Sequence, residues 1–263
     1  MSINLTPFEH DVLCRGNTWV IADEDVLAQQ IARVALGQSR HVQRILAGAL
    51  LATPATTNSA AAGAIELLTV SAGDDPWHRD GWMFQVLSWI AAHRATPGGI
   101  IRAPHTNHAH KGFDGLELEL DHKSGTVTAA VIFEDKATDN PRRTIQKDVW
   151  PEFKAFESGE RENVLVAEMI GLLATQPNVD PDIAIQNVIW KNVRHYRISI
   201  TVGDAHSDEA GRRRLFKGYD EIATGPSRRR RGETFHVKNL RQWMQSVADK
   251  AIAAVQVEVK PNV

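Results

Sequence analysis

A stretch in the middle of the chain constrains the fold most, because its apolar residues recur with a period of two. In DGLELELD, residues 114–121, Leu116, Leu118 and Leu120 fall on one face of a strand. HKSG supplies a turn, and residues 126–136 then read as a strand that is apolar on both faces. Such a strand is typical of the centre of a sheet. The stretch therefore predicts a β-hairpin inside a larger sheet.

Helical spacing of apolar residues dominates the rest of the chain. Before the hairpin it predicts helices over residues 23–51, 59–71 and 81–93. After the hairpin, Asn140 and Pro141 are typical of a helix start, and further helices are predicted over residues 162–175, 182–191 and 240–255. Residues 196–202 and 234–238 read as two more strands. We therefore expect an α/β fold, with residues 1–75 as a helical N-terminal region packed on a core of residues 76–263.

The composition is that of a soluble globular protein, since 43% of the 263 residues are hydrophobic and 24% are charged. No apolar run approaches the roughly 20 residues that a membrane-spanning helix needs. The first residues, MSINLTPFEHDV, lack the basic and apolar regions of a signal peptide. Cys14 is the single cysteine, which excludes an internal disulfide and a cysteine-based zinc site. We therefore expect a cytoplasmic protein without a membrane partner.

The predicted central strand ends in charged residues. Glu134 and Lys136 share a face with Ile132, so they lie at the end of an apolar row. A buried carboxylate and a buried ammonium cost free energy unless they are paired or bind a metal ion. In an antiparallel hairpin, Asp114 at the start of the first strand lies beside the end of the second. We therefore predict that these three residues cluster at one sheet edge, as a structural ion pair or as a catalytic site.

An Asp followed about twenty residues later by Glu-x-Lys on the next strand resembles the PD-(D/E)XK nuclease superfamily. The helix before the hairpin, GWMFQVLSW, resembles the GxxFQ or GxxFE helix of nuclease effectors in bacterial anti-phage and restriction systems, which makes Gln85 a candidate. Gln146 is a further polar residue of this kind. The resemblance covers residues 81–150. The chain departs from the family pattern in having Phe113 before Asp114 instead of proline, and Gln85 instead of the more frequent glutamate.

The resemblance implies a restriction-endonuclease-like mixed sheet core, flanked by helices and carrying a helical N-terminal extension. It also implies metal-dependent hydrolysis of DNA phosphodiester bonds. Asp114 and Glu134 would hold Mg²⁺ or Mn²⁺ together with the carbonyl of Asp135, because hard oxygen ligands suit these ions. Lys136 would orient or activate the attacking water.

The implied biological role is that of an effector in an anti-phage or restriction system acting on double-stranded DNA. The chain has no P-loop motif, so a helicase, ATPase or sensor subunit would be its protein partner. Homo-oligomerisation is compatible with this role. The alternative is a non-catalytic DNA-binding or assembly subunit that keeps a nuclease-like fold.

Positive charge is concentrated towards the C-terminus. Residues 194–241 contain twelve Lys and Arg and six Asp and Glu, a net charge of +6, whereas the whole chain carries −2. Two runs stand out, and both are candidate contacts to DNA phosphates: Arg212, Arg213, Arg214, and Arg228, Arg229, Arg230, Arg231. A solvated surface with no nucleic-acid partner is the equally weighted alternative.

A histidine-rich loop offers a rival site. PHTNHAHKG contains His105, His108 and His110, which could hold zinc or another transition metal, or could position a phosphate beside Asp114. The chain has no G-x-S-x-G motif, so the sequence gives no support to a serine hydrolase.

Overall fold

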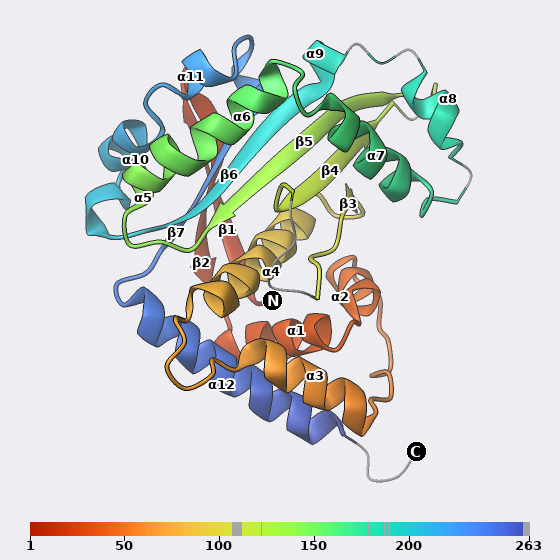
Figure 1. The fold of residues 1–263 in the computed structure, drawn as a ribbon, viewed down its shortest axis with the longest axis vertical. Coiled ribbons are helices and arrows are strands. Elements are labelled where there is room, and N and C mark those ends of the chain that lie inside the picture. The colour runs from red at the N-terminus through yellow and green to blue at the C-terminus, as the bar shows by residue number, and fades with distance from the viewer. Residues whose placement is uncertain (107–111, 122, 178, 187, 189, 260–263) are drawn as a thin grey trace.

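The computed structural model describes residues 1–106, 112–121, 123–177, 179–186, 188 and 190–259, and its centre is a mixed β-sheet (Figure 1). Within these residues the sheet has seven strands in the order β1-β2-β7-β6-β5-β4-β3. Their bounds are β1 Ile3–His10, β2 Cys14–Ile21, β3 Ile100–Ile101, β4 Gly115–Leu120, β5 Val127–Lys136, β6 Arg194–Val202 and β7 Arg230–His236.

The direction of the strands changes across the sheet. β2, β7, β6 and β5 are parallel to one another, whereas β1 pairs antiparallel with β2, and β4 pairs antiparallel with β5 and β3. The β4–β5 pair is the hairpin that the alternating pattern predicts, and Gly115 lies opposite Phe133 in it. The prediction of an α/β fold with a sheet flanked by helices is therefore confirmed.

Helices cover both faces of the sheet, which explains why β5 is apolar on both faces. Val131 and Phe133 belong to a core with one set of helices (the α4 side), and Ala130 and Ile132 belong to a core with another (the α6 side). In Figure 1 the α4 side lies below the sheet and the α6 side above it. The α4 side contains α1 Glu24–Ala35, α2 Ser39–Leu46, α3 Asn58–Leu68, α4 Trp77–Ala95 and α12 Leu240–Glu258.

The α6 side is built from shorter helices. It contains α5 Pro141–Thr144, a π-helical turn Ile145–Val149, α6 Trp150–Glu157, α7 Glu162–Leu173, α8 Pro181–Ile185, α10 Glu209–Phe216 and α11 Tyr219–Ile222. A further short helix, α9 Trp190–Val193, leads directly into β6. Each residue of β6 is buried, so this strand lies deepest between the two helical layers.

The N-terminus differs from the prediction. A helical N-terminal extension was expected, but the chain begins with a hairpin, β1–β2, that joins the sheet beside β7. An edge strand need not alternate clearly between apolar and polar residues. Proline, which lacks a backbone N–H, is tolerated on an edge strand such as β1, and Pro7 is an example. The single helix expected over residues 23–51 is also two helices, since Gly37 adopts a φ of 75° between α1 and α2.

Among the described residues, no helix is both long and apolar enough to cross a membrane.

Candidate active site

The structure brings together the three charged residues that the hairpin pattern predicts to cluster. Asp114 directly precedes β4, and Glu134 and Lys136 end β5. The Lys136 Nζ atom lies 3.0 Å from Oδ2 of Asp114 and 2.7 Å from Oε2 of Glu134. The prediction that these residues meet at one edge of the sheet is confirmed as geometry.

Asp114 is held by donors from two elements. Nε2 of Gln85 on α4 donates to its Oδ1 at 2.7 Å, and the backbone N–H of Asp135 donates to its Oδ2 at 2.8 Å. The next residue, Gly115, lies close against Phe133, since a Cβ atom there would be 2.7 Å from Cδ2 of that ring. Gln85 therefore reaches the cluster from the helical layer, as its place in the α4 sequence predicts.

The cluster contains one ammonium between two carboxyl groups. Glu134 is 3% exposed, and burial raises its pKa to about 8, with Lys136 opposing the rise and Asp114 adding to it. Burial alone would lower the pKa of Lys136, but Asp114 and Glu134 beside it raise the pKa above the usual range for lysine. The site is thus short of positive charge when both acids are ionised.

The donor set suits a hard cation better than zinc. Asp114 and Glu134 contact the same ammonium, and Mg²⁺ commonly takes only one or two carboxylates and fills its remaining positions with water. In the described part of the chain, no group of three or more His, Cys, Asp or Glu residues is placed to hold a metal ion by itself. The residues present therefore fit a loosely held, partly hydrated Mg²⁺ or Mn²⁺.

Asp135 connects the cluster to the α4 side of the sheet. Its carboxyl Oδ1 accepts a hydrogen bond of 2.6 Å from Ser88 Oγ, and Ser88 Oγ accepts one of 2.8 Å from Nη1 of Arg197. Ser88 also lies 3.0 Å from the hydroxyl of Ser199. Burial raises the pKa of Asp135 to about 7; the charge of Arg197 opposes this rise, and the charge of Asp114 adds to it.

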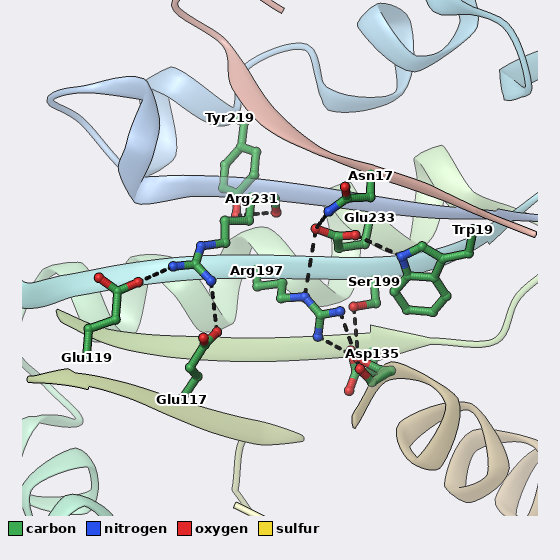
Figure 2. A network of polar contacts seen from close by, with 11 residues as sticks. Asn17, Trp19, Glu117, Glu119, Asp135, Arg197, Ser199, Tyr219, Arg231 and Glu233 are labelled. Atoms are coloured by element: carbon green, nitrogen blue, oxygen red, sulfur yellow. Dashed lines mark hydrogen bonds and ion pairs between the residues drawn. The ribbon is translucent and has the colours of Figure 1, made fainter. Parts of the chain in front are cut away.

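Sequence reasoning did not find this buried polar group (Figure 2). A signal was present, because Arg197, Ser199 and Thr201 alternate with apolar residues in YRISITV and so share one face of β6. Because buried polar side chains are nearly always hydrogen-bonded, polar residues in a strand that is buried along its whole length predict hydrogen-bond partners on the neighbouring elements.

The structure does not bring Arg228–Arg231 onto one exposed surface. Arg229 and Arg230 are 6% and 2% exposed. Arg229 pairs with Glu157 and donates to the carbonyl of Arg194, while Arg230 donates to four backbone carbonyls. Burial and these contacts tie both guanidinium groups to the protein itself, so they are not available to phosphate in this structure. Arg231 pairs with Glu117 and Glu119, and Arg228 is exposed.

The other arginine run lies on α10 with more of its surface in solvent. Arg213 and Arg214 are exposed and Arg212 is half-buried. Arg213 pairs with Asp11 at 2.9 Å, and Nη2 of Arg214 donates to the carbonyl of Ala205 at 3.0 Å. Arg213 and Arg214 are therefore more accessible to a partner than the buried Arg229 and Arg230.

The histidine site is only partly described. His108 and His110 lie outside the described residues. The carbonyl of His105 accepts a hydrogen bond of 2.5 Å from Nε1 of Trp82, which ties the start of this loop to α4. Gln146 is exposed on the π-helical turn.

Comparison with known proteins found no matching family model, no matching curated protein and no matching solved structure.

Proposed function

We propose that this chain is a metal-dependent nuclease that hydrolyses DNA phosphodiester bonds on a restriction-endonuclease-like core. The observation that carries the proposal is the convergence of Asp114, Glu134 and Lys136 at the end of an otherwise apolar pair of strands. Placing three ionisable groups there costs free energy, and catalysis is a reason to bear that cost.

The proposed roles are those that the resemblance to the PD-(D/E)XK superfamily implies, and the contacts are compatible with them. Asp114 and Glu134 would hold Mg²⁺ or Mn²⁺, with the Asp135 carbonyl as a third oxygen. When bound, the ion supplies positive charge against the phosphate and lowers the pKa of an attacking water. Lys136 orients that water and offsets phosphate charge, and Gln85 positions Asp114 through its 2.7 Å hydrogen bond.

For DNA contact we propose the exposed arginines Arg213, Arg214 and Arg228. Arginine on a surface neutralises phosphate charge without reading sequence, which suits double-stranded DNA of any sequence. In this proposal the protein is an effector of an anti-phage or restriction system, and its partner is a helicase, ATPase or sensor subunit, since energy-driven movement on DNA would need another chain.

The test measures both DNA cleavage and metal binding, because a nuclease that depends on a partner subunit can lack cleavage activity when it is purified alone. Plasmid and linear DNA are incubated with the protein in Mg²⁺, Mn²⁺ or EDTA, and Mn²⁺ is titrated calorimetrically. We expect Asp114→Ala to abolish both cleavage and Mn²⁺ binding. Lys136→Ala should abolish cleavage, while Lys147→Ala, which changes an exposed lysine of the π-helical turn, should behave as wild type.

The alternative is a non-catalytic DNA-binding or assembly subunit in which Lys136 is only the counter-ion of two buried acids. It predicts DNA binding without Mn²⁺ binding and without cleavage in any metal. Cleavage that persists in the Asp114→Ala protein would contradict the catalytic site itself. Mn²⁺ binding without cleavage would support the metal site and direct the search to the partner.

A further inference from the structure

A cavity of about 570 Å³ opens on the α4 side of the sheet, away from the cluster of Asp114, Glu134 and Lys136. It lies between the C-terminal end of α4, the β1–β2 hairpin and the neighbouring strands β7 and β6. Its size is in the ordinary range for sites that bind small molecules, roughly 300 to 1,000 Å³. Its charged lining residues are Glu9, Arg15, Glu117, Arg197, Arg231 and Glu233.

The strand register builds this lining in rows. Arg15, Arg231 and Arg197 lie directly opposite one another on β2, β7 and β6. Like charges in directly opposite positions destabilise a sheet, so a row of three arginines needs compensation. Figure 2 shows how two of them obtain it. Arg231 reaches Glu117 and Glu119, and Arg197 donates to Ser88 and lies 4.0 Å from Glu233.

Two side chains of the lining, Arg15 and Glu117, have polar atoms that no described residue contacts. The side chain of Arg15 is exposed and makes no hydrogen bond or ion pair with any residue that the structure describes. Glu117 is 2% exposed, and only its Oε2 is paired, at 2.8 Å from Nη1 of Arg231. Its Oε1 is buried and has no hydrogen-bond partner among the described residues. An unsatisfied buried carboxylate oxygen is unfavourable and is rare without a functional reason.

We propose that this cavity binds a small molecule that carries both an anionic group, held by Arg15, and an N–H donor group, held by Glu117. The lining has three arginines and three glutamates, so an ion of one sign would gain from half of them and be repelled by the other half. A molecule with both kinds of group gains from both. Pro7, Ala92 and Ala95 supply an apolar wall for the part between the two polar ends.

Two common classes of metabolite share this chemistry, namely nucleotides with an exocyclic amine and basic amino acids. The proposed binding uses none of the residues assigned to DNA cleavage. Its test contains no DNA and no metal, so its outcome is independent of the proposed nuclease function.

The experiment is calorimetric titration of the full chain with complete and incomplete probes. The nucleotide arm uses adenosine 5′-monophosphate, with adenosine and ribose 5-phosphate as its two halves. The amino-acid arm uses L-arginine, with agmatine as the form that lacks the carboxylate. We expect one complete probe to bind with a Kd below about 1 mM, and its incomplete forms to bind at least about tenfold more weakly.

Three variants locate the binding. Arg15→Gln should reduce the affinity for the probe at least about tenfold, since it removes the positive charge that holds the anionic group. Ala95→Trp should abolish binding, because this exposed position lines the cavity and a large ring there fills it. Arg40→Gln, at an exposed arginine of α2 outside the lining, should bind as wild type.

Both changed lining positions are exposed, so folding should survive, and the thermal melting curve of each variant checks this. The proposal is overturned if neither complete probe binds the wild-type protein. It is equally overturned if binding is unchanged in Arg15→Gln, or persists in a folded Ala95→Trp protein.

Discussion

Buried titratable side chains are the most consequential single residues of this chain. Glu134 and Asp135 are consecutive and face opposite sides of the sheet. Lys136 forms an ion pair with Glu134, whereas Ser88 donates to Asp135 and accepts from Arg197. His93 on α4 is different, because its side chain has no such partner among the described residues. It is 2% exposed, its Nε2 makes no hydrogen bond with the described residues, and its ring lies edge-on to Trp89 at 4.7 Å.

His93 should make stability depend on pH. Burial lowers its pKa to about 4, whereas the unfolded chain has a value near 6.5. Above that value the histidine is neutral in both states and has no effect. As the pH falls from 6.5 towards 4, the unfolded state binds the proton first, so stability is lost. The expected loss from this residue between pH 7 and pH 5 is about 2 kcal/mol.

The measurement is urea unfolding at pH 7 and pH 5. His93→Phe should lose about 2 kcal/mol less than wild type between these two values, whatever its absolute stability. His78→Phe, at an exposed histidine of the same helix, should keep the wild-type difference. An equal pH dependence in wild type and His93→Phe would show that His93 is not buried in its neutral form.

At the scale of elements, the hairpin β4–β5 positions the candidate site. Phe133 on β5 packs against the backbone of Gly115, and Asp114 N–H donates to the Phe133 carbonyl at 3.1 Å. The close contact between the two strands therefore fixes where the Asp114 carboxylate lies. The guanidinium of Arg197 stacks on the ring of Phe133 at 4.4 Å, which leaves the ring little room to retreat.

Gly115→Ala should disturb this arrangement. The new methyl group would lie 2.7 Å from the Phe133 ring, so the strands must move apart and Asp114 with them. We expect stability to fall by about 1–3 kcal/mol and Mn²⁺ affinity to fall with it. Gly171→Ala is the matched control, because nothing lies within 4 Å of a Cβ atom there and alanine favours its helix, α7. If Gly115→Ala binds Mn²⁺ as wild type does, the contact between Gly115 and Phe133 does not determine the position of the Asp114 carboxylate.

The hairpin and the cluster at its end could be predicted because they depend on local information. Strict alternation, one turn and one antiparallel pairing suffice to bring Asp114 beside Glu134 and Lys136. The β1–β2 hairpin could not be predicted in the same way. The β1–β2 pair lies at an edge of the sheet, and burial in β1 does not alternate strictly, because the adjacent residues Thr6 and Pro7 are both exposed. The burial that creates a period of two is therefore weak there.

At the scale of the whole molecule, contacts between distant segments complete the sheet. Nε1 of Trp19 on β2 donates to Oε2 of Glu233 on β7 at 2.8 Å, and Asn17 donates to the other carboxylate oxygen at 3.2 Å. These partners are more than 200 residues apart in the chain. No local pattern could therefore have predicted them, nor that the run Arg228–Arg231 leads into a buried strand, where Arg229 and Arg230 stabilise the fold.

Trp19→Phe should show that the N-terminal hairpin unfolds together with the rest. The substitution keeps a ring but removes the N–H, which leaves a buried carboxylate oxygen of Glu233 without its donor. We expect the free energy of unfolding to fall by about 1–3 kcal/mol, with a single transition seen by fluorescence and circular dichroism. Trp77→Phe, at a tryptophan that is 63% exposed, should change stability little. A separate early transition in wild type would mean that the hairpin is an independent unit.

The two outer strands have a consequence for how copies of this chain can meet. β3 is two residues long, and β1 carries Pro7, which has no N–H to offer, and Glu9 on its free border. Neither margin presents the long, regular row of free peptide groups on which a second chain could extend the sheet. The described part of the protein is thus protected against growing into continuous sheets at high concentration. We therefore expect a dimer of this chain to form through its helical surfaces and not by extension of the sheet.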